Sequence, residues 1–255
     1  MLRLYRLLIE RIETMKILAI DTSNQPMAIA LVENRNLMAT TTLKMVKNHS
    51  VYVLPTIDRL MEIVKWTPED LDQIVVASGP GSYTGIRIAV TTAKVLADTL
   101  GINLVTVSSL QVLAANIPPL TNEIIVPFFD ARRGTVFAGQ YQWQNGSLLN
   151  IQSDQHLEMA DLISQLSKCA DSVVLVGEVT AKLAPLLTDL PQGIRLMTDV
   201  SALPSAYQLA LLGDGKASVA DVNTVVPRYL RRTEAEMNWL QTHPEGMDHD
   251  YVQRV

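Results

Sequence analysis

Apolar residues in the first half of the chain form short runs and helical stripes that alternate with polar turns. Continuous or alternating apolar runs predict strands, and apolar residues spaced three or four apart predict helices. The predicted strands span 16–21, 27–33, 37–44, 73–78 and 103–107, and the predicted helices span 50–65, 83–100 and 108–116. The order β-β-β-α-β-α-β-α is the plan of a ribonuclease-H-like or actin-like α/β domain.

A second block of elements follows the interruption at Ile117-Pro118-Pro119. Its predicted strands span 124–130, 135–143, 148–152 and 172–177, and its predicted helices span 158–168, 180–187 and 206–212. Asn145-Gly146 is a typical hairpin-turn pair between two of these strands. The block therefore predicts a second, smaller α/β domain.

This pattern divides the chain into four segments. Residues 1–14 are interpreted as an addition or a loose helical arm, because the first core strand begins afresh at Lys16. Residues 15–117 form the expected N-terminal domain, and residues 118–230 form the expected second domain, whose last helix is a candidate to pack back on the first. Residues 231–255 become polar, so a helix end and a mobile tail are expected there.

The composition of the chain argues against several classes of function. The 255 residues are 48% apolar and 18% charged, which is enough for real cores. A net charge of −5 argues against a protein that grips nucleic acid by itself, because phosphate contacts need clustered Lys and Arg. The single cysteine, Cys169, excludes a disulfide framework and a thiolate metal cluster. No apolar run reaches membrane-spanning length and the start does not fit a signal peptide, so a cytoplasmic protein without membrane contact is expected.

The strongest motif is a glycine-rich block between a predicted strand and a predicted helix. It reads Gly79-Pro80-Gly81-Ser82-Tyr83-Thr84-Gly85-Ile86-Arg87. Its three glycines allow backbone angles that other residues avoid, and Ser82 or Thr84 can cap the helix. Such a turn can hold an anion at the helix N-terminus, or it can be a tight turn without a ligand. The Gly-Lys-Ser/Thr ending of a Walker-type loop is missing, which disfavours that nucleotide-binding class.

Two shorter motifs are candidates for the same kind of site. Asp21-Thr22-Ser23 ends the first predicted strand, where actin-like ATPases place a carboxylate and hydroxyls around a phosphate, but a self-capped turn has the same sequence. Asp130-Ala131-Arg132-Arg133-Gly134 opens the hairpin of the second block. Its two arginines could pair with an acidic group of a partner, or they could simply lie in a solvated hairpin turn. The histidines are scattered, and no metal-binding motif occurs in the sequence.

Four segments of the chain resemble the TsaB (YeaZ) family. They are 17–23, 79–87, 130–133 and the closing Val226-Pro227-Arg228-Tyr229-Leu230-Arg231, in the order and spacing of that family. The glycine block with its Tyr-Thr-Gly-Ile-Arg ending is highly specific, and the other three are individually weak. The resemblance implies a two-domain actin-like (ASKHA, ribonuclease-H-like) fold, in which each domain is a mixed sheet flanked by helices.

The resemblance also implies a function. Proteins of this family dimerise with the related catalytic protein TsaD and work with the ATPase TsaE. Together they transfer threonylcarbamoyl from its adenylate to adenosine 37 of tRNAs that read codons starting with A. ATP or ADP and a metal are expected in the partner complex, with no cofactor or metal of the chain's own. The chain is expected to meet tRNA only through the complex, and a homodimer of the chain alone is an open alternative.

The comparison with TsaD further implies that this chain lacks the reaction centre. In TsaD, a helix with two histidines four residues apart holds the catalytic metal. Matching that helix onto 107–113 places Ser109 and Leu113 at the two ligand positions, and leucine cannot bind a metal. The alternatives are an actin-like metal-dependent peptidase and a small-molecule kinase. The missing histidine pair disfavours the peptidase, and the absence of a second glycine-rich block in the C-terminal half disfavours the kinase.

The partner surface is expected on the two long helices of the first domain, which form the dimer surface in the resembling family. On helix 83–100, alanines recur every four residues and leave one side without bulk. The expected interface residues are Val53, Leu60, Val64, Ala89, Ala93, Ala97, Arg132 and Arg133. A helix that is covered on both sides within its own chain has the same pattern, so burial of the alanines is the alternative.

Overall fold

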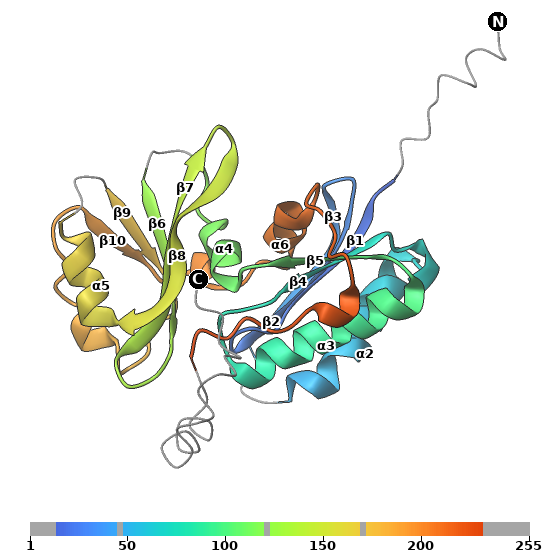
Figure 1. Ribbon diagram of the computed structural model, residues 1–255, viewed down its shortest axis with the longest axis horizontal. Helices are drawn as coiled ribbons and strands as arrows, with labels where there is room; N and C mark the ends of the chain where they lie inside the picture. Colours follow the sequence, from blue (N-terminus) through green and yellow to red (C-terminus); the bar gives the residue numbers. More distant parts are fainter. Residues whose placement is uncertain (1–13, 45–47, 120–122, 169–171, 232–255) are drawn as a thin grey trace, which may run out of the picture.

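The computed structural model describes residues 14–44, 48–119, 123–168 and 172–231. These residues form two domains side by side, each built on one mixed sheet with helices on its faces (Figure 1). The two-domain actin-like architecture expected from the sequence is therefore confirmed. Most of the expected N-terminal extension, most of the expected tail, and Cys169 lie outside the described residues.

The first sheet has five strands in the order β3-β2-β1-β4-β5. The strands are β1 (Lys16–Asp21), β2 (Pro26–Glu33), β3 (Asn36–Lys44), β4 (Gln73–Ala77) and β5 (Asn103–Val107). The first three strands form an antiparallel meander, and β4 and β5 extend the sheet in parallel with β1. Parallel strands need crossover connections, and the long helices provide them.

The second sheet repeats this order, as β8-β7-β6-β9-β10. Its strands are β6 (Ile124–Asp130), β7 (Thr135–Gln144), β8 (Ser147–Glu158), β9 (Val173–Val176) and β10 (Ile194–Met197). Strands β6, β7 and β8 pair antiparallel, whereas β9 and β10 run parallel to β6. The two domains therefore share one strand plan.

Helices α2 (His49–Val64) and α3 (Tyr83–Leu100) cover one face of the first sheet, and α6 (Ala206–Gly213) packs on the other face against β1 and β2 (Figure 1). The short α4 (Ser109–Ala114) lies between the two sheets, and α5 (Met159–Leu166) covers the second sheet. Because both faces of the first sheet are covered, its central strands are apolar on both sides.

The ends of α3 follow from its sequence. The Ser82 side chain accepts a hydrogen bond from the Gly85 N–H at 3.3 Å, which caps the first turn. Gly101 ends the helix with a left-handed φ of 64°, a conformation that glycine adopts without strain. The predicted bounds of this helix are confirmed.

The second domain differs from the sequence-based expectation in two places. The stretch 180–187 is not a helix; it contains only the 3₁₀ turn Ala184–Leu186. Pro185 has no N–H and disfavours a helix interior. The 16-residue α2 tolerates Pro55, but a stretch as short as 180–187 offers little to offset that cost. The edge strand β10 was not expected, because its four residues are only half-buried and carry no clear alternation. Among the described residues, no helix is long and apolar enough to cross a membrane.

Candidate functional site

The glycine loop and the end of β1 are pressed together at one edge of the first sheet. The Ser82 N–H donates to the Ser23 carbonyl at 2.7 Å, and the Thr22 hydroxyl donates to the Gly85 carbonyl at 2.7 Å. A Cβ at Gly81 would overlap the Ser23 carbonyl, and a Cβ at Gly85 would overlap that of Thr22. Glycine is required at both positions because two backbones meet there.

Asp21 is fully buried beneath this contact. Its Oδ1 accepts a hydrogen bond from the Ser23 N–H at 2.8 Å. Its Oδ2 and the Ser23 hydroxyl oxygen have no hydrogen-bond partner among the described residues. Burial raises the pKa of Asp21, and the hydrogen bond from the Ser23 N–H and the nearby His49 act in the opposite direction. The carboxyl group is therefore held in an environment that favours its neutral form.

The closing segment Val226–Arg231 runs across the same edge. The Arg228 N–H donates to the Ser78 carbonyl at 2.7 Å, and a Cβ at Gly79 would overlap the Arg228 carbonyl. The Tyr229 ring stacks on the Tyr83 ring with centroids 4.7 Å apart and an interplanar angle of 24°. The structure thus brings the glycine loop and the closing segment into direct contact.

The fourth motif, the Asp130–Gly134 turn, faces these loops from the second domain. Asp130 accepts hydrogen bonds from the Arg132 N–H and the Thr180 hydroxyl, both at 2.6 Å. Arg132 and Arg133 have left-handed φ angles of 72° and 55°, and both side chains are exposed. Non-glycine residues in this region cost conformational energy and are often found at functional sites.

A cleft of about 1210 Å³ opens between the two domains at this point. Its walls include Gly81 to Gly85 on one side and Asp130 to Arg133 on the other. The charged residues lining it are Asp130, Arg132, Arg133, Glu178, Lys182 and Arg231. Glu178 is paired with Lys44 of the first domain at 2.6 Å, so the mouth of the cleft is more cationic than acidic.

The two positions that the resemblance matched to TsaD metal ligands lie on α4. Ser109 and Leu113 are both about 1% exposed, and the Ser109 hydroxyl accepts a hydrogen bond from the Gly79 N–H at 3.1 Å. Leu113 packs in the apolar core between α4 and the second sheet. Within the described part of the chain, no three His, Cys, Asp or Glu side chains are grouped so that they could hold a metal ion.

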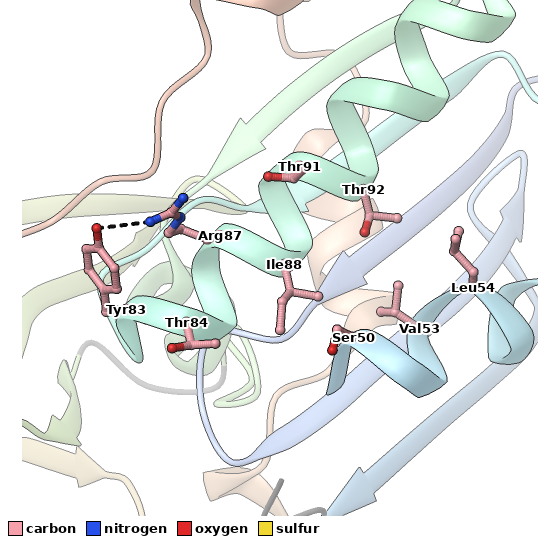
Figure 2. Close-up of a pocket in the computed structure, with 9 residues that line it drawn as sticks. All are labelled: Ser50, Val53, Leu54, Tyr83, Thr84, Arg87, Ile88, Thr91 and Thr92. Carbon is pink, nitrogen blue, oxygen red and sulfur yellow. Dashed lines mark hydrogen bonds between the residues drawn. The ribbon is translucent and has the colours of Figure 1, made fainter. Parts of the chain in front are cut away.

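A second hollow, of about 420 Å³, lies on the outer face of the first domain between α2 and α3. Figure 2 shows that α2 and α3 both contribute side chains to it. The lining residues are Ser50, Val53, Leu54, Tyr83, Thr84, Arg87, Ile88, Thr91 and Thr92. We call this hollow the α2–α3 groove. Arg87 is the charged residue in the groove, and it donates a hydrogen bond to the Tyr83 hydroxyl at 3.2 Å.

The expected interface residues on these helices need correction. Ala89, Ala93 and Ala97 are at most 1% exposed and belong to the core under the first sheet. Small side chains let α3 lie close to the strands, so the alanine stripe faces inward. Val53 and Leu60 of α2 are also buried, and Val64 is half-buried.

The apolar residues that these helices do expose are different ones. They are Val51, Tyr52, Leu54, Ile63, Tyr83 and Val95. Helical spacing also places Thr84, Ile88, Thr91 and Val95 on one outer stripe of α3, a signal that could have found this face. Arg132 and Arg133 lie apart from it, in the cleft.

Sequence reasoning also missed Asp154 of β8. It is 3% exposed and binds Arg228 of the closing segment at 2.8 Å. Nothing in the local sequence distinguishes it from a surface residue of a polar edge strand.

Two mixed sheets of one strand plan, with a cleft between them, define an actin-like α/β protein. Residues 38–239 match the family model described as TsaD, tRNA N6-adenosine threonylcarbamoyltransferase. The chain is 42% identical over 230 residues to the tRNA threonylcarbamoyladenosine biosynthesis protein TsaB of Bacillus subtilis, covering 89% of this chain and 99% of that protein. It is 29% identical over 129 residues to TsaB of Escherichia coli, covering 50% and 55%.

The solved structure of YeaZ from Pseudomonas aeruginosa has the same fold. It superposes with a TM-score of 0.71 at 24% identity, covering 85% of this chain and 100% of that one. The chain belongs to the TsaB (YeaZ) family of tRNA threonylcarbamoyladenosine biosynthesis proteins.

Proposed function

We propose that this chain is a non-catalytic subunit that dimerises with TsaD through the outer face of α2 and α3. In that complex it works with TsaE to form N6-threonylcarbamoyladenosine at position 37 of tRNAs that read codons starting with A. The observation that carries the proposal is the α2–α3 groove in a chain of the TsaB family. Exposed apolar side chains around a hollow are typical of protein-binding surfaces.

The groove suits a helical protein partner. Leu54 is 53% exposed at its wall, and Val95 is 58% exposed one turn beyond Thr91. The more buried Val53 and Ile88 give the groove an apolar base, which suits the apolar face of another helix. Eight of the nine residues that line the groove are uncharged, so an apolar helix face of the partner can be desolvated against them at little electrostatic cost.

The non-catalytic role is supported by α4. A leucine in the core and a serine that already accepts a backbone hydrogen bond occupy the positions matched to the metal ligands of TsaD. In this proposal, ATP or ADP and the metal belong to the partner complex and not to this chain. The net charge of −5 supports tRNA contact only through that complex.

The test is a charge placed in the groove. Leu54→Glu should leave the fold intact because the side chain is half exposed, but it should weaken TsaD binding about 100-fold, as expected for a charge forced into an apolar interface core. The matched control is Val200→Glu, at a residue that is 76% exposed and lies outside the groove; it should bind as the wild type does. Isothermal titration with purified TsaD measures both. A folded Leu54→Glu variant with unchanged affinity would overturn this placement.

A further inference from the structure

A buried carboxylate joins the two domains. Asp154 of β8 has a side chain that is 1% exposed. Its Oδ1 accepts a hydrogen bond from the Tyr141 hydroxyl at 2.5 Å, and its Oδ2 accepts from the Ser108 hydroxyl at 2.5 Å and from the Arg228 guanidinium at 2.8 Å. Tyr141 belongs to the second sheet, Ser108 caps α4, and Arg228 belongs to the closing segment. Three separate parts of the chain therefore meet on one side chain.

The second sheet is shaped to hold this carboxylate. A Cβ at Gly139 would overlap Asp154 Oδ1, and the pairing of β7 with β8 shifts register on both sides of Gln140. Burial and the charge of Asp154 raise the pKa of Tyr141, which keeps its hydroxyl protonated and donating. The bulge at Gln140 and the lack of a side chain at Gly139 both make room for Asp154, which indicates a specific structural role for this residue.

From Arg228 the contacts continue to the α2–α3 groove. Tyr229, the next residue, stacks on Tyr83, and Arg87 donates to the Tyr83 hydroxyl and lies over its ring, with the guanidinium carbon 5.4 Å from the centroid. Tyr83 and Arg87 both line the groove (Figure 2). The series Asp154, Arg228, Tyr229, Tyr83 and Arg87 is thus an unbroken run of contacts from the second domain to the groove.

We propose that the closing segment, anchored by Asp154, sets the positions of Tyr83 and Arg87 and thereby controls the affinity of the groove for its partner. This inference rests on the proposed function, because the closing segment would regulate the same α2–α3 groove that is proposed to bind TsaD. Its physical basis is that Tyr83 is exposed on the outside and needs Tyr229 to fix its ring. Tyr229 is fixed in turn by the neighbouring Arg228, whose backbone and side chain are both bound.

A continuous run of contacts couples Asp154 to the groove only if a change at Asp154 alters the free energy of partner binding. Asp154→Asn keeps the size of the side chain but removes the charge that binds Arg228. We expect this variant to bind TsaD about tenfold more weakly, within the usual range of coupling between distant sites. The control is Glu123→Gln, which weakens another carboxylate–arginine pair of the second domain, with Arg195, that does not touch the closing segment. It should bind within about twofold of the wild type.

A second variant covers the case in which Asp154→Asn fails to fold. Tyr229→Leu leaves the buried pair in place and removes only the ring stack, so it should weaken binding in the same direction. If both variants fold, the double variant should bind no more weakly than the worse single one, because both break the same run of contacts. Additive losses, or unchanged affinity in Tyr229→Leu, would overturn the inference.

The two claims fail in different ways. If the wild-type chain does not bind TsaD at all, the proposed function is wrong. If the wild type binds, Leu54→Glu does not, and Tyr229→Leu binds as tightly as the wild type, then the surface is correct and the control by the closing segment is wrong.

Discussion

The two domains share one strand order, yet the loops at equivalent strand ends are built in opposite ways. β1 and β6 each end in an aspartate. Asp21 is fully buried under the glycine loop, and its Oδ2 has no hydrogen-bond partner in the part of the chain that the structure describes. Asp130 is partly exposed, and both of its oxygens accept hydrogen bonds. The same framework therefore gives a closed loop in the first domain and an open, cationic turn in the second.

The crossover after the fourth strand differs as well. In the first domain it contains α3, with 18 residues, whereas in the second it contains only a 3₁₀ turn before β10. Among the described residues, the first domain alone therefore presents two long neighbouring helices, α2 and α3. The difference explains why the α2–α3 groove lies on that domain.

The largest effect is expected from a charge on the inner side of α3. Ala93→Glu should unfold the protein, because an unpaired carboxylate in the core costs several kcal/mol. Val95→Glu, two residues further along, should keep the fold because that side chain is 58% exposed. Circular dichroism during heating distinguishes them, and a folded Ala93→Glu variant would show that the stripe is not core.

Glycine substitutions sharpen the contrast between the closed and the open loop. Gly85→Ala should cost about 3 kcal/mol of unfolding free energy, because its Cβ would overlap the Thr22 carbonyl. Gly134→Ala in the open turn should cost about 1 kcal/mol, since only its left-handed φ of 81° is unfavourable and its surroundings are roomy. Urea unfolding measures both, and equal costs would contradict the comparison.

A smaller effect is expected from the two aspartates. The raised pKa of Asp21 means that the folded state holds its proton more tightly than the unfolded state does. Its contribution to stability is then present below the unfolded pKa and is lost as pH rises through the folded pKa. Asp21→Asn, which mimics the neutral form, should gain stability over the wild type by about 1 kcal/mol as the pH rises from about 4 to neutral.

Asp130→Asn is the matched comparison in the second domain. It replaces one acceptor oxygen of a carboxylate whose two oxygens are both in use, so it should lose about 1 kcal/mol at neutral pH. Chemical denaturation across pH measures the unfolding free energy of both variants. If both are more stable, or both less stable, than the wild type at neutral pH, the two carboxyl groups do not lie in opposite environments.

Local signals in the sequence predicted much of this structure. The bounds of α3 and β6 agree with expectation, since Ser82, Gly101 and a continuous apolar run mark them directly. β10 was missed because a short half-buried strand has no distinctive pattern. The helix predicted over 180–187 is absent because apolar spacing in so short a stretch does not offset the cost of Pro185 in a helix interior.

The site was predictable in its parts but not in its assembly. Each of the four motifs was visible in the sequence. The structure brings three of them to the wall of the cleft and buries the fourth, Asp21-Thr22-Ser23, against the glycine loop. Periodicity could not show whether the alanines of α3 face the sheet or the solvent, because both faces of a crossover helix can be apolar. The contact of Asp154 with Arg228 joins residues 74 positions apart, and no local pattern reports such a pair.

We propose that this chain contributes to tRNA modification through a partner bound at α2 and α3. The most direct measurement is mass-spectrometric detection of threonylcarbamoyladenosine in tRNA incubated with TsaD, TsaE, the threonylcarbamoyl donor and this chain. From this proposal we expect modification with the full set, none with this chain as the only protein, and a strong loss with Leu54→Glu but not with Val200→Glu. Modification that is unaffected when this chain is left out, or that this chain performs by itself, would contradict it.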